Sequence, residues 1–201
     1  MQILISLYFV MNLILGPPLN VRVDSQYGLP EWYAPGESAV ARQALDDMLM
    51  AAERDGLKAA IFSGYRDYRY QAQVYAREKR NWPERVDEFI ASPGHSEHQL
   101  GTAFDIAWPG LPVQSMDERN RRLFRWVQAN AHNFGFVVSY PFKRYQDWPY
   151  SNRWKAMETD FIYEPWHLRY VGVELATEMF AAGYLDPEST VYPLDFYEPW
   201  P

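Results

Sequence analysis

Residues 92–108 read Ser-Pro-Gly-His-Ser-Glu-His-Gln-Leu-Gly-Thr-Ala-Phe-Asp-Ile-Ala-Trp, which places imidazole, carboxylate and small residues close together. Residues 102–108 alternate and are rich in strand formers, so we expect Asp105 within a strand and His98 in a loop or short helical turn before it. In a single helix this spacing would hold the two side chains about 10 Å apart, too far to share one ion. A chain that doubles back at Gly101 can bring them together. We therefore interpret the segment as half of a metal site.

A second segment, residues 163–170, reads Tyr-Glu-Pro-Trp-His-Leu-Arg-Tyr and offers a further ligand in His167. Two imidazoles and one carboxylate form a common catalytic zinc shell, which leaves a fourth position for water. Glu164 lies three residues before His167 and could accept the proton of that water. We predict one zinc ion per chain, held by His98, Asp105 and His167, with Glu164 as the catalytic base.

These motifs resemble those of the VanY group of zinc D-alanyl-D-alanine carboxypeptidases. The family pattern S-x-H-x-x-G-x-A-x-D matches residues 96–105, and its E-P-W-H matches residues 164–167. Its Ser-Gly-Tyr-Arg motif is present at residues 63–66, and the glutamine that follows it is Gln71. The resemblance runs from roughly residue 29 to residue 183. It implies an α+β, hedgehog/DD-peptidase-like fold, with a small antiparallel sheet and flanking helices.

The resemblance also implies which residues meet the substrate. In this family the arginine that matches Arg66 holds a carbonyl or carboxylate of the substrate, and its planar fork suits a carboxylate. Gln71 could point toward Arg66, and Ser96 would line the substrate cleft. Because Arg66 and Gln71 offer donors for a terminal carboxylate, we expect hydrolysis of the terminal peptide bond of peptidoglycan stem peptides.

Other functions remain open at this point. L,D-carboxypeptidases and endolysin-like peptidoglycan endopeptidases would share the fold and differ in the bond that they cut. A noncatalytic, zinc-stabilised binding domain, as in hedgehog signalling proteins, would keep the metal shell and lack the base. The presence of Glu164 disfavours this last alternative.

The amino-acid composition limits which classes of protein and which partners are possible. With 201 residues, 48% of them hydrophobic and 17% aromatic, the chain can build a sizeable core, and we expect one catalytic domain over residues 19–201, acting as a monomer. The net charge of −7 argues against a nucleic-acid partner and against adhesion to anionic membranes. The absence of cysteine excludes thiolate ligands and disulfides and leaves the redox compartment undetermined.

Residues 1–16 are apolar almost throughout, and Pro17 and Pro18 break the run. The run is too short to count as an assured membrane span, but it has the length of the apolar region of a secretory signal, without the preceding basic residues. We predict that residues 1–18 are a signal peptide or a truncated membrane anchor, which would place the domain outside the cytoplasm. An N-terminal strand packed on the domain and an internal start codon are the alternatives.

Periodicity predicts strands at residues 19–23, 57–63, 102–108 and 136–140, and helices at residues 37–54, 67–79, 84–90, 117–131 and 171–182. We expect an antiparallel sheet that carries Asp105 and His167, with helices covering its back. His95 and His132 are predicted to be structural. The loop at residues 143–155 mixes aromatic and basic residues, which could grip the substrate or pin the loop to the core.

Overall fold

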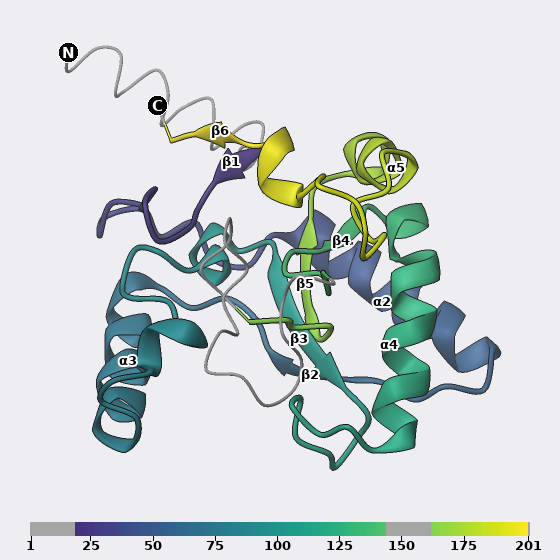
Figure 1. Cartoon of the computed structure of the whole chain (residues 1–201), viewed down its shortest axis with the longest axis horizontal. Helices are drawn as coiled ribbons and strands as arrows, with labels where there is room; N and C mark the ends of the chain where they lie inside the picture. Colours follow the sequence, from purple (N-terminus) through teal and green to yellow (C-terminus); the bar gives the residue numbers. More distant parts are fainter. Residues whose placement is uncertain (1–18, 144–161, 201) are drawn as a thin grey trace.

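Figure 1 shows the computed structural model of the protein, which describes residues 19–143 and 162–200. A four-stranded sheet in the order β2-β3-β5-β4 lies at its centre, and all three neighbouring pairs are antiparallel. Helices flank this sheet, which confirms the predicted α+β class. The described helices are α2 (Ala39–Arg54), α3 (Tyr68–Asn81), α4 (Glu118–Asn130) and α5 (Val173–Ala181). The described strands are β1 (Val21–Arg22), β2 (Ala60–Ser63), β3 (Ala103–Ala107), β4 (Phe136–Val138), β5 (His167–Tyr170) and β6 (Glu198–Pro199).

The two central strands, β3 and β5, turn one face toward the helices and the other toward the site. Phe104, Ile106 and Leu168 belong to the main core, together with apolar residues of α2, α4 and α5. Because side chains alternate along a strand, Asp105 and His167 point to the opposite face. The two residues are direct partners in the β3–β5 pairing. The sheet therefore presents two of the predicted ligands side by side.

Helix α3 lies apart from α2, α4 and α5 in Figure 1 and borders the site instead of the main core. Asp67 starts this helix by accepting a hydrogen bond from the backbone of Tyr70, as an N-cap residue does. The cap follows Arg66 directly, so the beginning of α3 fixes the backbone on which Arg66 sits. Along α3 only Gln71 and Val74 are buried.

Gly101 is the point at which the chain turns between His98 and Asp105, as the sequence predicts. Its φ of +78° lies in the left-handed region that favours glycine, and a Cβ at this position would collide with the carbonyl oxygen of Gly36. The carbonyl of Gly101 also accepts a hydrogen bond from the backbone of Ser38 at 2.8 Å. Contacts with the segment before α2 therefore hold the turn that brings the two ligands together.

Several predicted boundaries were wrong. The strand predicted at 57–63 begins only at Ala60, and its pairing with β3 shifts register between Ile61 and Ser63. The helix predicted at 84–90 is a single 3-10 turn, Val86–Glu88. At the chain ends, β1 pairs in parallel with β6, a pairing that the sequence did not indicate.

Two predicted features, residues 1–18 and all but the first residue of the loop at 143–155, lie outside the described residues. Within residues 19–143 and 162–200, none of the helices combines the length and the apolar character that crossing a bilayer requires.

Candidate metal centre and active site

The three predicted metal ligands meet on the face of the sheet that turns away from the main core. Asp105 lies in β3, His167 in β5, and His98 in the 3-10 helix Glu97–Leu100 that precedes β3. Nε2 of His98 is 3.3 Å from one carboxylate oxygen of Asp105, and Nδ1 of His167 is 3.1 Å from the other. One ligand atom from each residue lies within 4.8 Å of the other two, and all three side chains are buried. This cluster could hold a metal ion.

The second nitrogen of each imidazole has a partner that fixes which nitrogen faces Asp105. Nδ1 of His98 is 2.7 Å from the carbonyl oxygen of Gly64, and Nε2 of His167 is 2.9 Å from a carboxylate oxygen of Glu97. Both partners can only accept, so these nitrogens carry the hydrogens. The remaining nitrogens, Nε2 of His98 and Nδ1 of His167, are left to coordinate. Two such nitrogens and one carboxylate oxygen fit a catalytic zinc site.

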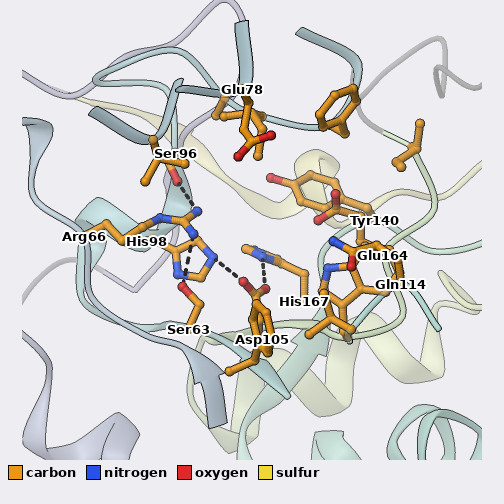
Figure 2. Close-up of a pocket in the computed structure, with 18 of the residues that line it drawn as sticks. Ser63, Arg66, Glu78, Ser96, His98, Asp105, Gln114, Tyr140, Glu164 and His167 are labelled. Atoms are coloured by element: carbon orange, nitrogen blue, oxygen red, sulfur yellow. Dashed lines mark hydrogen bonds and ion pairs between the residues drawn. The ribbon is translucent and has the colours of Figure 1, made fainter. Parts of the chain in front are cut away.

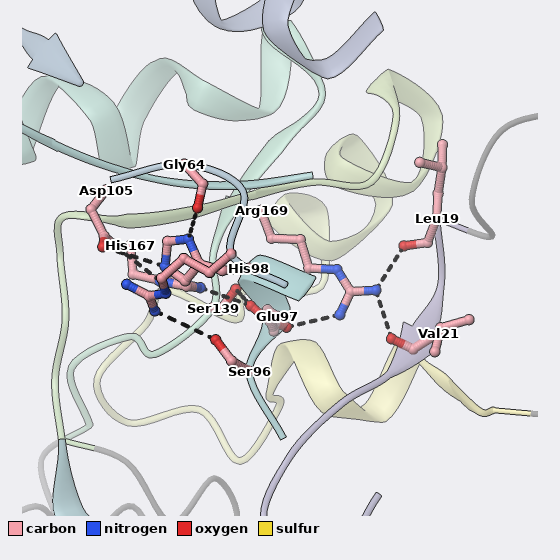
Figure 3. A network of polar contacts seen from close by, with 11 residues as sticks. Leu19, Val21, Gly64, Ser96, Glu97, His98, Asp105, Ser139, His167 and Arg169 are labelled. Carbon is pink, nitrogen blue, oxygen red and sulfur yellow. Dashed lines mark hydrogen bonds and ion pairs between the residues drawn. The ribbon is translucent and has the colours of Figure 1, made fainter. Parts of the chain in front are cut away.

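Glu97 lies behind His167 and is itself buried (Figure 3). Its Oε2 accepts hydrogen bonds from His167 and, at 2.6 Å, from the hydroxyl of Ser139, while its Oε1 accepts one from Arg169 at 2.8 Å. None of the sequence motifs points to Ser139 or Arg169. Alternation along β5 was the available signal for Arg169, because it lies two residues after His167 and so shares its face.

The charges of the cluster suit metal binding. Burial alone would raise the pKa of Asp105, but His98 and His167 hold it well below its ordinary range, so this ligand is anionic. Burial lowers the pKa of His98 to about 4, so its ring is neutral at pH 7. Burial would also lower the pKa of His167, but its hydrogen bonds to Asp105 and Glu97 raise it to about 10. A cation that binds at Nδ1 of His167 therefore displaces a proton.

A cavity of about 640 Å³ opens in front of this cluster. Figure 2 shows the three ligands at its floor and the predicted substrate and catalytic groups around it. The lining includes His98, Asp105, His167, Arg66, Ser96 and Glu164. The structure thus brings together every predicted site residue except Gln71.

Glu164 reaches the cavity from a turn that is tied to both neighbouring strands. Its backbone N–H donates to the carbonyl of Tyr140, and its own carbonyl accepts from the backbone of His167, both at 3.1 Å. The side chain is only 9% exposed, and burial raises its pKa to about 8. A carboxylate with a pKa close to neutral pH can take up a proton and give it back, as a general base and acid must.

Arg66 borders the same cavity with its guanidinium only partly occupied. Nη1 donates to the hydroxyl of Ser63 at 3.0 Å and Nη2 to that of Ser96 at 3.5 Å, and the buried Nε has no hydrogen-bond partner within the described ranges. Burial lowers the pKa of Arg66, against the opposing effect of the carboxylates of Asp105 and Glu164. A half-buried cation that is short of partners is well placed to receive an anionic group of a ligand.

Gln71 does not face the cavity, contrary to the expectation that it points toward Arg66. It is fully buried, and its Nε2 donates to the carbonyl of Ala91 at 2.6 Å. The two remaining histidines lie outside the metal cluster. Nδ1 of His95 is 2.7 Å from the carbonyl of Asp24, and the ring of His132 stacks on Phe180 with centroids 3.7 Å apart.

Known proteins resemble the chain over most of its length. Residues 37–173 match the family described as VanY, D-alanyl-D-alanine carboxypeptidase. YodJ of Bacillus subtilis is 34% identical over 175 residues, covering 77% of this chain and 60% of that protein. The D-alanyl-D-alanine carboxypeptidase of Enterococcus faecalis is 31% identical over 149 residues, covering 69% of this chain and 50% of that enzyme. The chain therefore spans between 50% and 60% of the length of these relatives.

Solved structures share the fold. The LD-carboxypeptidase LdcB superposes with a TM-score of 0.66 at 30% identity, covering 85% of this chain and 88% of that one. A mutant of the D,D-pentapeptidase VanY from a VanB-type vancomycin resistance cassette, solved with Zn(II), gives a TM-score of 0.66 at 29% identity, covering 83% and 94%. The predicted hedgehog/DD-peptidase-like fold is confirmed by this likeness.

Proposed function

The chain belongs to the VanY family of D-alanyl-D-alanine carboxypeptidases, and from this premise we propose that it is a zinc-dependent carboxypeptidase that removes the terminal D-alanine from peptidoglycan stem peptides. One observation carries the proposal. His98, Asp105 and His167 converge on one point at the floor of a cavity that is also lined by Glu164 and Arg66. Metal ligands, a base and an anion-binding cation are the groups that hydrolysis of a C-terminal peptide bond needs.

His98, Asp105 and His167 would hold the zinc ion, the metal with which the VanY relative was solved. Zinc in such a site polarises a carbonyl group and lowers the pKa of water. Glu164 is the proton carrier: its buried carboxylate accepts a proton from the attacking water and passes it to the leaving amine. The raised pKa of Glu164 suits both transfers. This residue also weighs against a noncatalytic zinc-stabilised domain.

Arg66 anchors the free carboxylate of the substrate. A charge-assisted, bidentate contact would use donors that its contacts with Ser63 and Ser96 leave over. A substrate whose chain continues past the bound residue has an amide in place of the carboxylate and would leave the half-buried guanidinium without an anionic partner. Ser96 contributes by holding Arg66 at the edge of the cavity. These contacts favour removal of a terminal residue over cleavage inside a cross-linked strand.

The cavity is longer than a terminal dipeptide requires. It extends from the metal cluster past Tyr70 and Val74 of α3 to Trp82 and Phe89. Tyr70 and Trp82 are both about half exposed, at 52%, and line this extension. We assign the extension to the residues of the stem peptide that precede the scissile bond. Because the substrate lies in the cell wall, we place the enzyme outside the cytoplasm, exported or anchored through residues 1–18. We also propose that it acts as a monomer.

L,D-carboxypeptidase activity is the second candidate. LdcB, named as an LD-carboxypeptidase, and the VanY D,D-pentapeptidase resemble the chain equally well, both with a TM-score of 0.66. Both activities would use the same ligands, base and arginine, so the two differ in the residue that precedes the scissile bond.

One experiment separates the candidates. The zinc-loaded protein is incubated with muropeptides that carry pentapeptide or tetrapeptide stems, and the products are identified by mass spectrometry. Loss of one D-alanine from pentapeptide stems supports the proposal. Loss of D-alanine from tetrapeptides alone supports the second candidate. Cleavage of cross-bridges or of the L-Ala-D-Glu bond with intact termini would refute both.

A further inference from the structure

A buried ion pair lies directly behind the metal cluster and joins the two ligand-bearing segments. Arg169 is fully buried and Glu97 is 1% exposed, and Nη1 of the arginine is 2.8 Å from Oε1 of the carboxylate. Glu97 immediately precedes His98, and Arg169 follows His167 by two residues on β5. Hydrogen bonds to the remaining atoms offset the cost of burying an ion pair, and in this pair only Nε of Arg169 has no partner within the described residues. The partners of the two groups therefore show what the pair depends on.

On the carboxylate side the partner is a metal ligand. Oε2 of Glu97 accepts from Nε2 of His167 at 2.9 Å and from the hydroxyl of Ser139 at 2.6 Å. The hydrogen bond to His167 keeps Nδ1 of the ring directed at Asp105. Such outer contacts set the orientation of a ligating histidine and its affinity for the metal.

On the guanidinium side the partners are the two ends of the described chain. Nη2 of Arg169 donates to the carbonyl oxygens of Leu19 and Val21 at 3.0 and 2.6 Å, and the ring of Tyr197 lies 4.0 Å from its Cζ. Figure 3 shows Leu19 and Val21 on the far side of Arg169 from the metal ligands. The backbone of Glu198 donates to the carbonyl of Asn20 at 2.7 Å, so the two ends also hold each other.

We propose that Arg169 is a positioning residue that makes residues 19–21 a structural part of the metal centre. The carbonyls of Leu19 and Val21 hold Arg169, Arg169 holds Glu97, and Glu97 holds the ring of His167. Docking of the N-terminal segment and binding of the metal at His167 are therefore coupled, so each strengthens the other. The proposal rests on the metal site of the proposed function but is independent of the bond that is cut.

The test compares Arg169→Lys with a matched control, Lys143→Met. Lysine keeps the positive charge but lacks the planar guanidinium, so its single ammonium group cannot contact the carboxylate of Glu97 and the carbonyls of Leu19 and Val21 together. Lys143 is a second buried cation, and it donates to the carbonyls of Tyr184, Asp186 and Val191 at 2.7, 3.1 and 2.9 Å. It contacts no metal ligand among the described residues, so its loss should destabilise the fold without loosening His167.

Two quantities are measured without substrate, at a temperature where circular dichroism shows each variant to be folded. The first is the zinc dissociation constant, from competition with a chelator. We expect it to rise at least about 10-fold in Arg169→Lys, the lower end of the effect of losing an outer contact, and to stay within about twofold in Lys143→Met. A value in Arg169→Lys within about twofold of wild type would overturn the proposal.

The second quantity is hydrogen–deuterium exchange in peptides that cover residues 19–23 and 197–200. Zinc should slow this exchange in the wild type and in Lys143→Met, but not in Arg169→Lys. If zinc did not change the exchange rate of these peptides in the wild type, the coupling would be refuted. If Arg169→Lys does not fold, the double variant Glu97→Gln/Arg169→Met, which removes both charges of the pair, replaces it with the same expected results. A wild-type protein that binds no zinc would contradict the metal site itself, before any variant is compared.

Discussion

The carboxylate of Glu97 accepts a hydrogen bond from Nε2 of His167 at 2.9 Å, on the side of the ring opposite Asp105. The ring of His167 therefore lies between two carboxylates, each of which contacts a different ring nitrogen. Asp105 belongs to the candidate metal cluster with it, whereas Glu97 contacts the outer nitrogen of its ring. This geometry disfavours Glu97 as a catalytic base, although it is adjacent to His98, because it does not line the cavity.

This arrangement makes the metal-free fold sensitive to acid. Burial would raise the pKa of Glu97, but Arg169 and His167 lower it from 4.5 to about 2. A lowered pKa means that the stabilisation is complete above pH 4.5 and is lost as the pH falls toward 2. The difference corresponds to about 3 kcal/mol. Urea unfolding of the chelated protein between pH 6 and 2.5 should show most of this loss, and Glu97→Gln should flatten the profile. Equal slopes in the two proteins would contradict the role of Glu97.

Activity should rise with pH through the pKa of Glu164, because a base works only when it is ionised. Burial raises this pKa to about 8 in the protein alone, and a neighbouring cation lowers the pKa of a carboxylate. The acidic limb of kcat/KM should therefore lie at or below pH 8. A profile measured from pH 5 to 9 checks this. A kcat/KM that falls as the pH rises from 5 to 7 would be inconsistent with Glu164 as the base.

Arg66 should determine the preference for a free C-terminus. In Arg66→Met we expect kcat/KM for a D-Ala-D-Ala peptide to fall about 10²-fold or more, while zinc content stays unchanged, because a charge-assisted contact inside the cavity is lost. The preference for the free acid over its C-terminal amide should disappear as well. Arg69→Met is the matched control, since the side chain of Arg69 is 83% exposed and does not line the cavity. If Arg66→Met kept the preference, the anchor would have to be another group.

The extension of the cavity should make longer stem peptides better substrates. Trp82→Ala should raise KM for a pentapeptide several-fold and leave KM for a terminal dipeptide unchanged, because only the longer peptide reaches this ring. Trp32→Ala serves as the control: Trp32 is 55% exposed, close to the 52% of Trp82, and does not line this cavity. Steady-state kinetics with both substrates measures these KM values. Equal changes of KM in the two variants would refute the assignment of this part of the cavity to the stem peptide.

The clustering of His98, Asp105 and His167 was predictable because much of its information lies in short motifs. His98 and Asp105 are joined by a turn that requires glycine, and His167 carries its own short motif with Glu164. The alternation of side chains along β3 and β5 then places the ligands on the same face. Only the pairing of β3 with β5 joins segments that are far apart in the sequence.

The support behind the site was not predictable in the same way. Arg169 reaches backbone carbonyls at Leu19 and Val21, and a carbonyl is present at every residue, so nothing in the sequence singles these out. The predicted orientation of the Gln71 side chain was wrong for a related reason. Packing of α3 turned its amide toward the carbonyl of Ala91, and helical spacing alone does not fix which face of a helix meets a cavity.

The most direct test of the account measures bound zinc and the rate of D-alanine release together, on the same preparations. We expect one zinc per chain and D-alanine release in the wild type, one zinc per chain with a rate at least about 10²-fold lower in Glu164→Gln, and loss of zinc in His167→Ala. Wild-type activity in Glu164→Gln, loss of zinc from that variant, or full activity in thoroughly chelated wild-type protein would contradict it.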